Sequence, residues 1–366
     1  MKKRNGFFLL QLDLTDECNL QCVHCYHERR KTENVFSIPD FWESLLQQAV
    51  DLGDRLNKHV TIGLSGGEPL LFPKLQQLLD YANCIGSQNS QFSIALMTNG
   101  TLFTKEVSQK LNKFFPVLSV IQFSLEGASA PVHEFRRGSN SFNSTIAGIY
   151  NAVNLTPMKV VVNCTIAKDN LSEALELVQV CKNLNVNRID FTRLMQSNKT
   201  NKNLARISSA EYRSLRKILY EIEQKLSKKN SSNERLLSIN QGRPLAHLVA
   251  PDIAIEQYNL GKRNRLGAAC SVGHASLSIL SDGTVYGCRR LPIPIGHLCR
   301  NSLVEIWYNS NMLKKLRKRN LYIVGKCKNC FFFKNYPDIC NGGAMCTSYA
   351  IYNDINKPDP YCWYQK

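Results

Sequence analysis

The sequence predicts an α/β protein in which a partial (β/α)6 barrel is followed by a small cysteine-rich domain. Two observations support this prediction. Apolar, strand-like segments alternate with amphipathic stretches over the first half of the chain, a pattern typical of a parallel sheet covered by helices. From residue 270 onward that pattern gives way to short segments rich in glycine, proline and cysteine. We therefore divide the 366 residues into a barrel (1–195), a linker with a bridging helical segment (196–265) and a C-terminal domain (266–366).

Six segments are predicted as strands of a parallel sheet, because they are almost continuously apolar. They are 7–14, 59–64, 92–97, 118–125, 158–167 and 188–195. A closed barrel of this kind takes eight strands, so six predict an open barrel with room for a bulky substrate. Polar chemistry is expected at the C-terminal ends of these strands.

Amphipathic stretches between the strands predict helices that pack on the sheet. Apolar residues share one helical face in two of them: Phe41, Leu45, Leu46, Ala49 and Val50, and then Leu75, Leu78, Leu79 and Ala82. Residues 196–206 are polar and predict a linker. Residues 209–228 predict a bridging helix whose apolar face carries Tyr212, Leu215, Leu219, Ile222 and Leu226.

The composition is that of an ordinary folded domain, with 43% hydrophobic residues, but the formal net charge is +17. A basic chain attracts acidic partners, either a peptide or a nucleic acid. The chain lacks the interleaved aromatic and basic residues of a nucleic-acid recognition motif, so we expect no nucleic-acid partner. No apolar run reaches the roughly 18 residues that a membrane span needs. We therefore expect no membrane partner and a cytoplasmic location.

Ten of the 14 cysteines fall into two groups with short internal spacings. Disulfide scaffolds are typical of small secreted domains, whereas short spacings in a reducing compartment indicate metal ligation. Cys18, Cys22 and Cys25 form a CxxxCxxC loop directly after the first predicted strand. Three thiolates can hold three irons of a [4Fe–4S] cube and leave the fourth iron open. The alternative is a structural zinc site, which needs a fourth ligand such as His24 or His27.

This loop resembles that of the radical S-adenosylmethionine (SAM) superfamily, with His24 where the family usually has an aromatic residue. The resemblance implies that Cys18, Cys22 and Cys25 hold a catalytic cluster whose open iron binds the methionine part of SAM. Ser65-Gly66-Gly67-Glu68-Pro69 follows the second strand and resembles the family's GGEP motif. It implies a contact of Glu68 with the amino group of SAM.

Further matches to the same family follow the later strands, so that the resemblance covers roughly residues 7–195. Asn99 follows the third strand, and Ser124 and Glu126 belong to an S-x-E-G match after the fourth. Either Arg136 or Arg137 is expected to pair with the carboxylate of SAM, because a guanidinium matches a planar carboxylate. The resemblance also implies ribose or adenine contacts from Asn163 and Leu194.

The second cysteine group resembles a SPASM domain. Cys270-x12-Gly283-x4-Cys288 fits that pattern fully, with Asp282-Gly283 as a hairpin turn. Cys327-x2-Cys330-x9-Cys340-x5-Cys346 has longer gaps than the family's x5 and x3, and Cys362 follows. The resemblance implies two auxiliary iron–sulfur clusters, each expected to be [4Fe–4S]. The ligands of the proximal cluster would be Cys270, Cys288 and Cys346, with a fourth site that is open or filled by a residue such as His274. The distal cluster would use Cys327, Cys330, Cys340 and Cys362.

Two structural zinc sites are the alternative for the whole C-terminal group. Four cysteines are left over. Cys84, Cys164 and Cys181 are expected to be buried core thiols, and Cys299 is either a stray thiol or a spare ligand.

The resemblance implies an oxidoreductase that generates a 5′-deoxyadenosyl radical to remove a hydrogen atom from its substrate. Auxiliary clusters suit reactions in which an electron then leaves the substrate. The leading hypothesis is therefore a maturase that installs an oxidative C–C or ether crosslink in a ribosomally made precursor peptide. An electron donor such as flavodoxin or ferredoxin would supply the reducing electron.

Other hypotheses are a peptide epimerase, a thioether-forming maturase and an anaerobic sulfatase-maturing enzyme. A nucleic-acid-binding iron–sulfur or zinc protein is a further alternative. No catalytic base is assigned, because Arg289 stands where related enzymes have an acidic residue.

Overall fold

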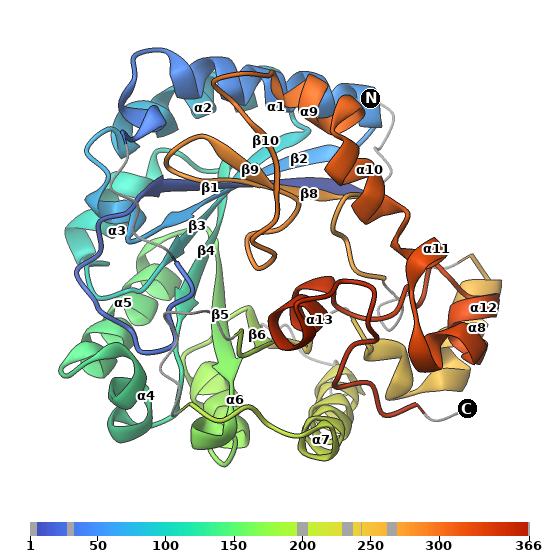
Figure 1. Cartoon of the computed structure of the whole chain (residues 1–366). Coiled ribbons are helices and arrows are strands. Elements are labelled where there is room, and N and C mark those ends of the chain that lie inside the picture. Colours follow the sequence, from blue (N-terminus) through green and yellow to red (C-terminus); the bar gives the residue numbers. More distant parts are fainter. Residues whose placement is uncertain are drawn as a thin grey trace.

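One sheet runs through the computed structural model, which describes residues 6–27, 33–195, 204–228, 237–242, 244–261 and 269–364. Within these residues ten strands follow the order β10-β9-β8-β1-β2-β3-β4-β5-β6-β7 (Figure 1). The strands are β1 (Phe7–Thr15), β2 (His59–Gly66), β3 (Phe92–Thr98), β4 (Leu118–Ser124), β5 (Lys159–Ile166), β6 (Arg188–Arg193), β7 (Ser238–Asn240), β8 (Ser276–Ile279), β9 (Thr284–Tyr286) and β10 (Pro294–His297).

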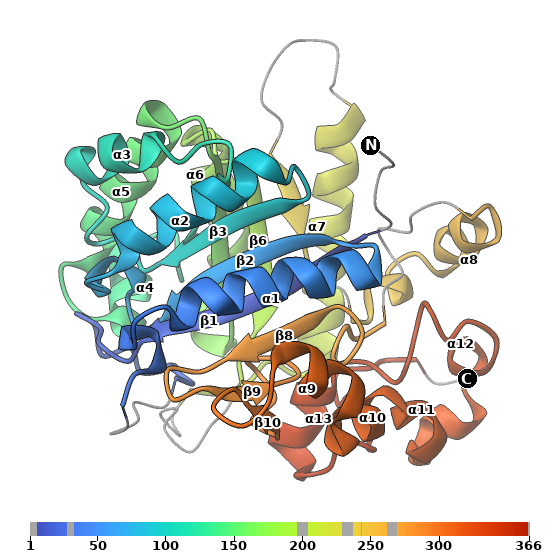
Figure 2. The ribbon, with the colours of Figure 1, turned by 90° about the horizontal axis from the view of Figure 1, so that it is seen from above.

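Helices cover the outer face of the curved sheet, as Figures 1 and 2 show for those that follow β1 to β5. In the first half of the chain they are α1 (Phe41–Leu56), α2 (Leu75–Gln88), α3 (Lys105–Asn112), α4 (Ala130–Arg137), α5 (Ser141–Leu155) and α6 (Ala174–Asn183). The later helices are α7 (Ser209–Lys228), α8 (Pro251–Asn259), α9 (Leu303–Asn309), α10 (Asn311–Arg317), α11 (Arg319–Tyr322), α12 (Phe331–Asn335) and α13 (Met345–Tyr352). None of the described helices is both long and apolar enough to cross a membrane.

The predicted partial barrel is confirmed. All six predicted strands form, each with bounds within two residues of the prediction, and neighbours from β1 to β6 pair in parallel. The predicted bridging helix is α7, with the same bounds. Of the predicted linker 196–206, residues 196–203 lie outside the described residues.

The sheet does not stop where the barrel stops. β7, from the bridging segment, pairs in parallel with β6. β8, from the cysteine-rich domain, pairs in parallel with β1 on the side away from β2. Asp282-Gly283 forms the turn of the β8–β9 hairpin, where Gly283 has a φ of +85° that favours glycine. The cysteine-rich domain is therefore hydrogen-bonded to the first strand of the barrel.

One prediction about the leftover cysteines is wrong. Cys164 and Cys181 are buried as predicted, but Cys84 is exposed. In α2 the buried positions are Leu75, Leu78, Leu79 and Ala82. Cys84 lies two residues after Ala82, which is about 200° of helical rotation, and so it faces outward.

Aromatic packing joins the cysteine-rich domain to the barrel. Trp307 of α9 contacts the ring of Phe8 in β1 edge-to-face, with ring centroids 5.2 Å apart. Its other neighbour is Arg317, whose guanidinium carbon lies 4.4 Å from the Trp307 ring centroid. Gln48 of α1 accepts a hydrogen bond from the Leu303 backbone N–H at 2.8 Å. Trp307 is only 5% exposed, so this contact is part of a common core.

We expect Trp307→Ala to lower the free energy of unfolding by about 3–5 kcal/mol, because it leaves a cavity between the two domains. Anaerobic urea unfolding followed by far-UV circular dichroism measures this change. The control is Tyr150→Ala on α5, where the ring is 58% exposed and the change should stay within about 0.5 kcal/mol. Equal effects of the two substitutions would show that Trp307 does not join the domains.

Candidate functional site

A cavity of about 650 Å³ lies at the C-terminal ends of the barrel strands. Alternation along the strands explains its polar walls, since successive side chains of a strand point to opposite faces. In β4, Gln122 and Ser124 line the cavity while Ile121 and Phe123 are fully buried in the core. Asn163 and Thr165 of β5 line the same cavity. The concave face of the sheet is thus polar at the end where chemistry is expected.

The cysteine loop is held by backbone contacts with the loop after β2. Gly67 N–H donates to the Thr15 carbonyl at 2.7 Å, and Glu68 N–H donates to the Glu17 carbonyl at 2.8 Å. A Cβ added to Gly67 would lie 2.0 Å from the Glu17 carbonyl oxygen, so no other residue fits there. Gly66 has a φ of +124°. The glycines of the Gly-Gly-Glu-Pro segment therefore permit the close approach that positions the cysteine loop.

Cys18, Cys22 and Cys25 all line the cavity. Burial raises the pKa of the Cys22 thiol, the Arg137 guanidinium lowers it, and the neighbouring Cys25 and Cys18 raise it again, with a net upward shift. Asn99 Nδ2 lies 4.0 Å from Cys18 Sγ, and Arg137 Nη1 lies 3.9 Å from Cys22 Sγ. Three thiols thus face one cavity, with donors beside two of them.

A zinc site at the cysteine loop would need a fourth ligand, His24 or His27. Among the described residues, no three cysteine, histidine or carboxylate side chains converge as the ligands of one metal ion do. The thiolates of a [4Fe–4S] cube each bind a different iron, so they stand farther apart. His24 is buried, and its Nε2 lies 3.3 Å from Glu126 Oε1. Burial lowers the pKa of His24, so a neutral ring can donate this hydrogen bond. The other candidate for a fourth zinc ligand, His27, has its Nε2 2.7 Å from Asp16 Oδ1.

Glu126 is a fully buried carboxylate behind the cavity wall. Its Oε1 accepts from Arg137 Nη2 at 2.6 Å and its Oε2 accepts from Thr165 N–H at 2.8 Å. Burial raises the pKa of Glu126, but Arg137, His24 and Arg136 lower it more, so that it stays well below the usual range. The ionised carboxylate therefore connects the cysteine loop, α4 and β5.

The structure distinguishes the two arginines that the sequence left equivalent. Arg136 is fully buried and turned away from the cavity, where it donates to both carboxylate oxygens of Asp169 at 2.5 and 2.7 Å and to the Thr165 carbonyl. Arg137 lines the cavity beside Cys22. The geometry favours Arg137 as the partner of a bound carboxylate and gives Arg136 a structural contact.

Of the other predicted cofactor contacts, His24, Gly66, Gly67, Asn99, Ser124 and Asn163 line the cavity. Glu68, Pro69, Glu126 and Leu194 do not. Glu68 is buried and accepts hydrogen bonds from Thr98 Oγ1 and Asn99 N–H, both at 2.8 Å, and these bonds fix the loop after β3. Leu194 packs with Ala167 and Leu204 in a small apolar cluster.

The sequence reasoning missed several polar cavity residues, including Gln11, Asp13, Gln122, Thr165 and Thr192. Gln11, Asp13, Gln122 and Thr165 alternate with apolar neighbours along their strands, so a period of two was the signal that could have identified them. Asp190, Arg193, Arg289 and Arg290 also line the cavity. The last two come from the cysteine-rich domain, far away in the sequence.

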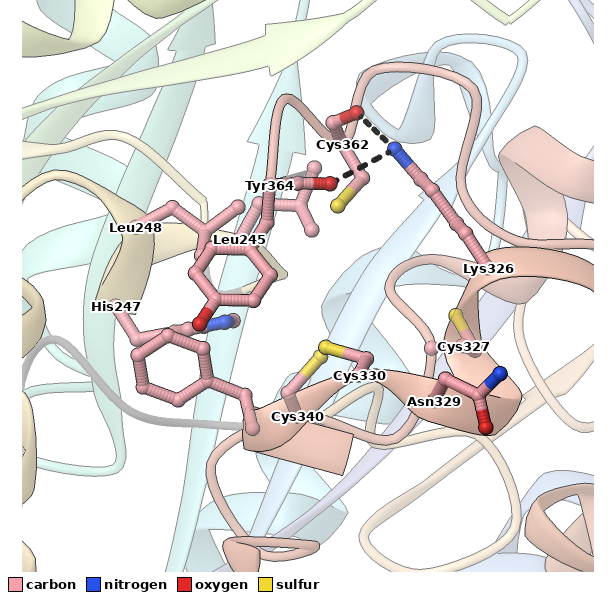
Figure 3. Close-up of a pocket in the computed structure, with 12 residues that line it drawn as sticks. Leu245, His247, Leu248, Lys326, Cys327, Asn329, Cys330, Cys340, Cys362 and Tyr364 are labelled. Atoms are coloured by element: carbon pink, nitrogen blue, oxygen red, sulfur yellow. Dashed lines mark hydrogen bonds between the residues drawn. The ribbon is translucent and has the colours of Figure 1, made fainter. Parts of the chain in front are cut away.

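The cysteines predicted for the distal cluster surround a cavity of about 360 Å³ in the C-terminal domain (Figure 3). Cys327, Cys330, Cys340 and Cys362 all line it. Burial, and then the neighbouring cysteines, raise the pKa of Cys327 to about 11. Lys326 Nζ donates to the Cys362 carbonyl at 2.6 Å and so holds the C-terminal segment over this cavity.

The three cysteines predicted for the proximal cluster also lie together. Burial, followed by the charges of Cys346 and Cys270, raises the pKa of Cys288 to about 12. A buried arginine, Arg319, holds the segment that carries Cys346 by donating to the Gly343 carbonyl at 2.9 Å. The three cysteines therefore lie close enough to act on one another, as ligands of one cluster must.

His274 and Cys299 are both exposed. The charges that act on the His274 ring are those of Arg317, Lys58 and Asp338, and no cysteine is among them. His274 as a ligand of the proximal cluster stays a prediction.

Comparison with known proteins agrees with this geometry. Residues 12–181 match the model of the radical SAM superfamily, and residues 270–331 match that of the SPASM iron–sulfur cluster-binding domain. The chain carries a radical SAM domain and a SPASM domain. Both lie where the cysteine loop and the cysteine-rich region had been predicted. Radical SAM and SPASM domains imply SAM and iron–sulfur clusters as cofactors, and the two groups of cysteines fit them.

The curated relatives of this radical SAM SPASM protein include a heme synthase and a mycofactocin maturase. The protein is 27% identical to the AdoMet-dependent heme synthase of Methanosarcina barkeri, over 98% of this chain and 96% of that protein. It is also 27% identical to the mycofactocin maturase MftC of Mycobacterium tuberculosis, over 96% of this chain and 82% of that protein.

The fold is shared with SuiB of Streptococcus suis, whose structures include a complex with S-adenosylmethionine and one with the precursor peptide SuiA. The SAM complex superposes with a TM-score of 0.72 at 18% identity, over 98% of this chain and 78% of SuiB. At this identity the likeness shows the fold alone.

We expect Arg137→Lys to weaken SAM binding about tenfold, because lysine keeps the charge but cannot pair with a carboxylate in a bidentate manner. Arg136→Lys is the matched control one residue earlier in α4. It should lower thermal stability, through loss of the Asp169 contact, without weakening SAM binding. Equilibrium dialysis of the reconstituted variants with labelled SAM measures both. Equal losses of SAM affinity would contradict the assignment of Arg137.

We expect anaerobically reconstituted protein to hold about 12 iron and 12 sulfide per chain, four of each for every cube. Changing Cys327 and Cys330 together to Ala should remove about four iron and leave the other clusters in place, because the distal cysteines line a separate cavity. Iron and sulfide assays measure the content. About four iron in the unaltered protein, or zinc in stoichiometric amount, would contradict three clusters.

Proposed function

We propose that the protein is a radical SAM maturase that oxidises a ribosomally made precursor peptide and joins two of its side chains. One observation carries this proposal. The cavity that holds Cys18, Cys22 and Cys25 borders a second cavity, and Cys346 of the predicted proximal cluster lines that second cavity. A substrate there lies between the site of hydrogen removal and a site that can accept an electron.

When bound, SAM and the [4Fe–4S] cluster at the cysteine loop supply a 5′-deoxyadenosyl radical, which removes a hydrogen atom from a substrate C–H bond. The chain's own residues bind and orient the reactants. Asn99, Ser124, Arg137 and Asn163 face the cofactor cavity, and the polar strand ends beside them provide hydrogen-bonding groups. We place this chemistry in the cytoplasm, because a reducing compartment keeps cysteine thiols available for iron.

Oxidative coupling balances with two auxiliary clusters. A crosslink removes two hydrogens from the peptide. One leaves as a hydrogen atom, and the other leaves as a proton and an electron. The electron needs an acceptor within reach of the substrate, and a cluster at Cys270, Cys288 and Cys346 would meet that need. A cluster held by the distal cysteines would then pass the electron toward the surface.

A peptide substrate is supported by two of the compared proteins, the mycofactocin maturase and SuiB, one of whose structures contains a precursor peptide. The open side of the six-stranded barrel also suits an extended chain better than a closed barrel does. A peptide epimerase, a thioether-forming maturase and an enzyme of the sulfatase-maturing type share these features, and the product distinguishes them.

The basic surface around the distal cysteines suits an acidic electron-transfer protein, such as the flavodoxin or ferredoxin proposed as donor. No Asp or Glu occurs between Glu305 and Asp338. In that stretch six lysines are exposed: Lys314, Lys315, Lys318, Lys326, Lys328 and Lys334. Complementary charge speeds the encounter of such partners.

A tetrapyrrole substrate is a second candidate, favoured by the near full-length match to the AdoMet-dependent heme synthase. The same two cavities and cysteine groups would serve it, because the oxidation again needs a hydrogen acceptor and an electron acceptor. The experiment below separates it from a peptide substrate.

We expect the co-expressed precursor peptide to lose about 2 Da for each crosslink, with one 5′-deoxyadenosine formed per event. High-resolution mass spectrometry of the peptide, with chromatography of the nucleoside, measures both. Changing Cys18, Cys22 and Cys25 together to Ala should abolish both products, and it is the control.

The alternatives give different masses. Epimerisation leaves the mass unchanged in ordinary water and adds about 1 Da per site in heavy water, because a solvent-derived hydrogen quenches the radical. That result would show that the reaction is epimerisation and not crosslinking. No change in any precursor, together with turnover of an iron porphyrin, would favour the tetrapyrrole candidate.

A further inference from the structure

A second cavity, of about 580 Å³, borders the cavity at the cysteine loop. The two share Tyr26, His27, Met195, Arg289 and Arg290, which therefore form the neck between them. Its far wall comes from α13, which Figure 1 shows on the concave side of the sheet. A molecule that reaches the cysteine loop from α13 passes these residues.

Most charges around the neck are already compensated. Arg289 forms an ion pair with Asp13, which is 1% exposed. His27 Nε2 lies 2.7 Å from Asp16 Oδ1, and Asp16 Oδ2 accepts from Ser281 Oγ at 2.8 Å. Arg289 follows Cys288, at the position where related enzymes have an acidic residue. In this protein its guanidinium pairs with Asp13, a carboxylate of β1.

The remaining cavity arginines have acidic partners too. Arg137 pairs with Glu126, with Nη2 2.6 Å from Oε1. Arg193 pairs with Asp359, with Nη1 2.8 Å from Oδ1, and its guanidinium carbon lies 4.9 Å from the Tyr361 ring centroid. Each of these two guanidinium groups has a carboxylate partner within the protein.

Arg290 is different. Among the described residues, no Asp or Glu lies within ion-pair distance of its side chain. Its Nη2 donates to the backbone carbonyl of Arg193, which fixes the side chain at the end of β6. A guanidinium has five N–H donors, so Nε and Nη1 can donate hydrogen bonds to a further acceptor. Since it is only partly exposed, solvent compensates its charge less than at the surface.

The walls beside Arg290 are partly aromatic and partly polar, since His27, Ser281 and Asn353 also line this cavity. Tyr26, Tyr286, Tyr349 and Tyr352 line the second cavity, together with Leu280 and Pro292. Among the described residues, the carboxylate that lines it is that of Asp16, which is held by His27 and Ser281 as described above. The cavity therefore combines tyrosine rings with a guanidinium that has no carboxylate partner among the described residues.

We propose that Arg290 binds a carboxylate of the substrate, adjacent to an aromatic or apolar group that the tyrosines contact. The proposal deepens the proposed function and rests on it: in a precursor peptide the carboxylate is an Asp or Glu side chain or the C-terminus. A guanidinium recognises such a planar anion through two parallel hydrogen bonds. Arg290 would thus determine which part of the peptide reaches the cysteine loop.

The test is a double-substitution cycle on the reconstituted holoenzyme with SAM present. The probes are fluorescein-labelled precursor peptides in which each Asp or Glu is changed in turn to Asn or Gln, and one with an amidated C-terminus. Fluorescence anisotropy gives each dissociation constant. We expect one of these changes, and Arg290→Gln, each to weaken binding about tenfold or more. With Arg290→Gln, that same peptide change should not raise the dissociation constant further.

Controls separate this role from structural damage. Arg290→Lys should restore part of the affinity, and Arg300→Gln, at an exposed arginine, should have no effect. Iron content and SAM affinity should be unchanged in Arg290→Gln. The proposal would be overturned if every peptide change weakened binding to Arg290→Gln as much as binding to the unaltered protein. A loss of SAM affinity in Arg290→Gln would also overturn it, because it would assign Arg290 to the cofactor.

Binding of a porphyrin tetracarboxylate and of its methyl ester distinguishes failure of the Arg290 subsite from failure of the proposed peptide substrate. If no peptide binds and the acid, but not the ester, binds in a manner that depends on Arg290, the carboxylate subsite stands and the peptide substrate is wrong. If neither the peptides nor the porphyrin depend on Arg290, the subsite itself is overturned.

Discussion

The geometry around the candidate site depends on one buried carboxylate, that of Glu126. It is withdrawn from solvent, so its charge must be compensated by the protein. The compensating groups come from three separate segments: His24 of the cysteine loop, Arg137 of α4 and the backbone N–H of Thr165 in β5. The three segments are therefore fixed relative to one another, and Arg137 is directed toward Cys22 as a result. Breaking a buried pair of this kind leaves an uncompensated charge, so the arrangement allows little variation.

Much of the fold could be read from the sequence, because the strands are nearly continuous apolar runs and their lengths are limited by the polar residues that follow. The cysteine loop, the Gly-Gly-Glu-Pro segment and the hairpin turn at Gly283 were also recognisable, since each needs particular residue types at fixed spacing. Gly67 is the clearest example: its Cβ would overlap the Glu17 carbonyl.

Side-chain direction could not be read in the same way. Arg136 and Arg137 are neighbours, and only the position of α4 against β5 decides that one meets Asp169 and the other meets the cavity. Glu68 looked like a cofactor ligand, yet its carboxylate is used to fix Asn99. Arg290 could not be recognised as a cavity residue, because it reaches the cavity from a domain that begins some 250 residues after the cysteine loop. Such contacts are set by tertiary packing rather than by local pattern.

The parallel pairing of β8 with β1 has a consequence for how this protein can be divided. With β8 in place, β1 is an interior strand bonded on both sides. A fragment that ended after β6 would leave β1 as a bare edge, with unpaired N–H and carbonyl groups and with buried residues such as Phe8 and Leu10 newly uncovered on the side of the missing domain. Exposed edges of this type recruit other chains and aggregate. The two domains thus share one sheet, and chimaeras that exchange C-terminal domains between relatives must carry a strand matched to the register of β1.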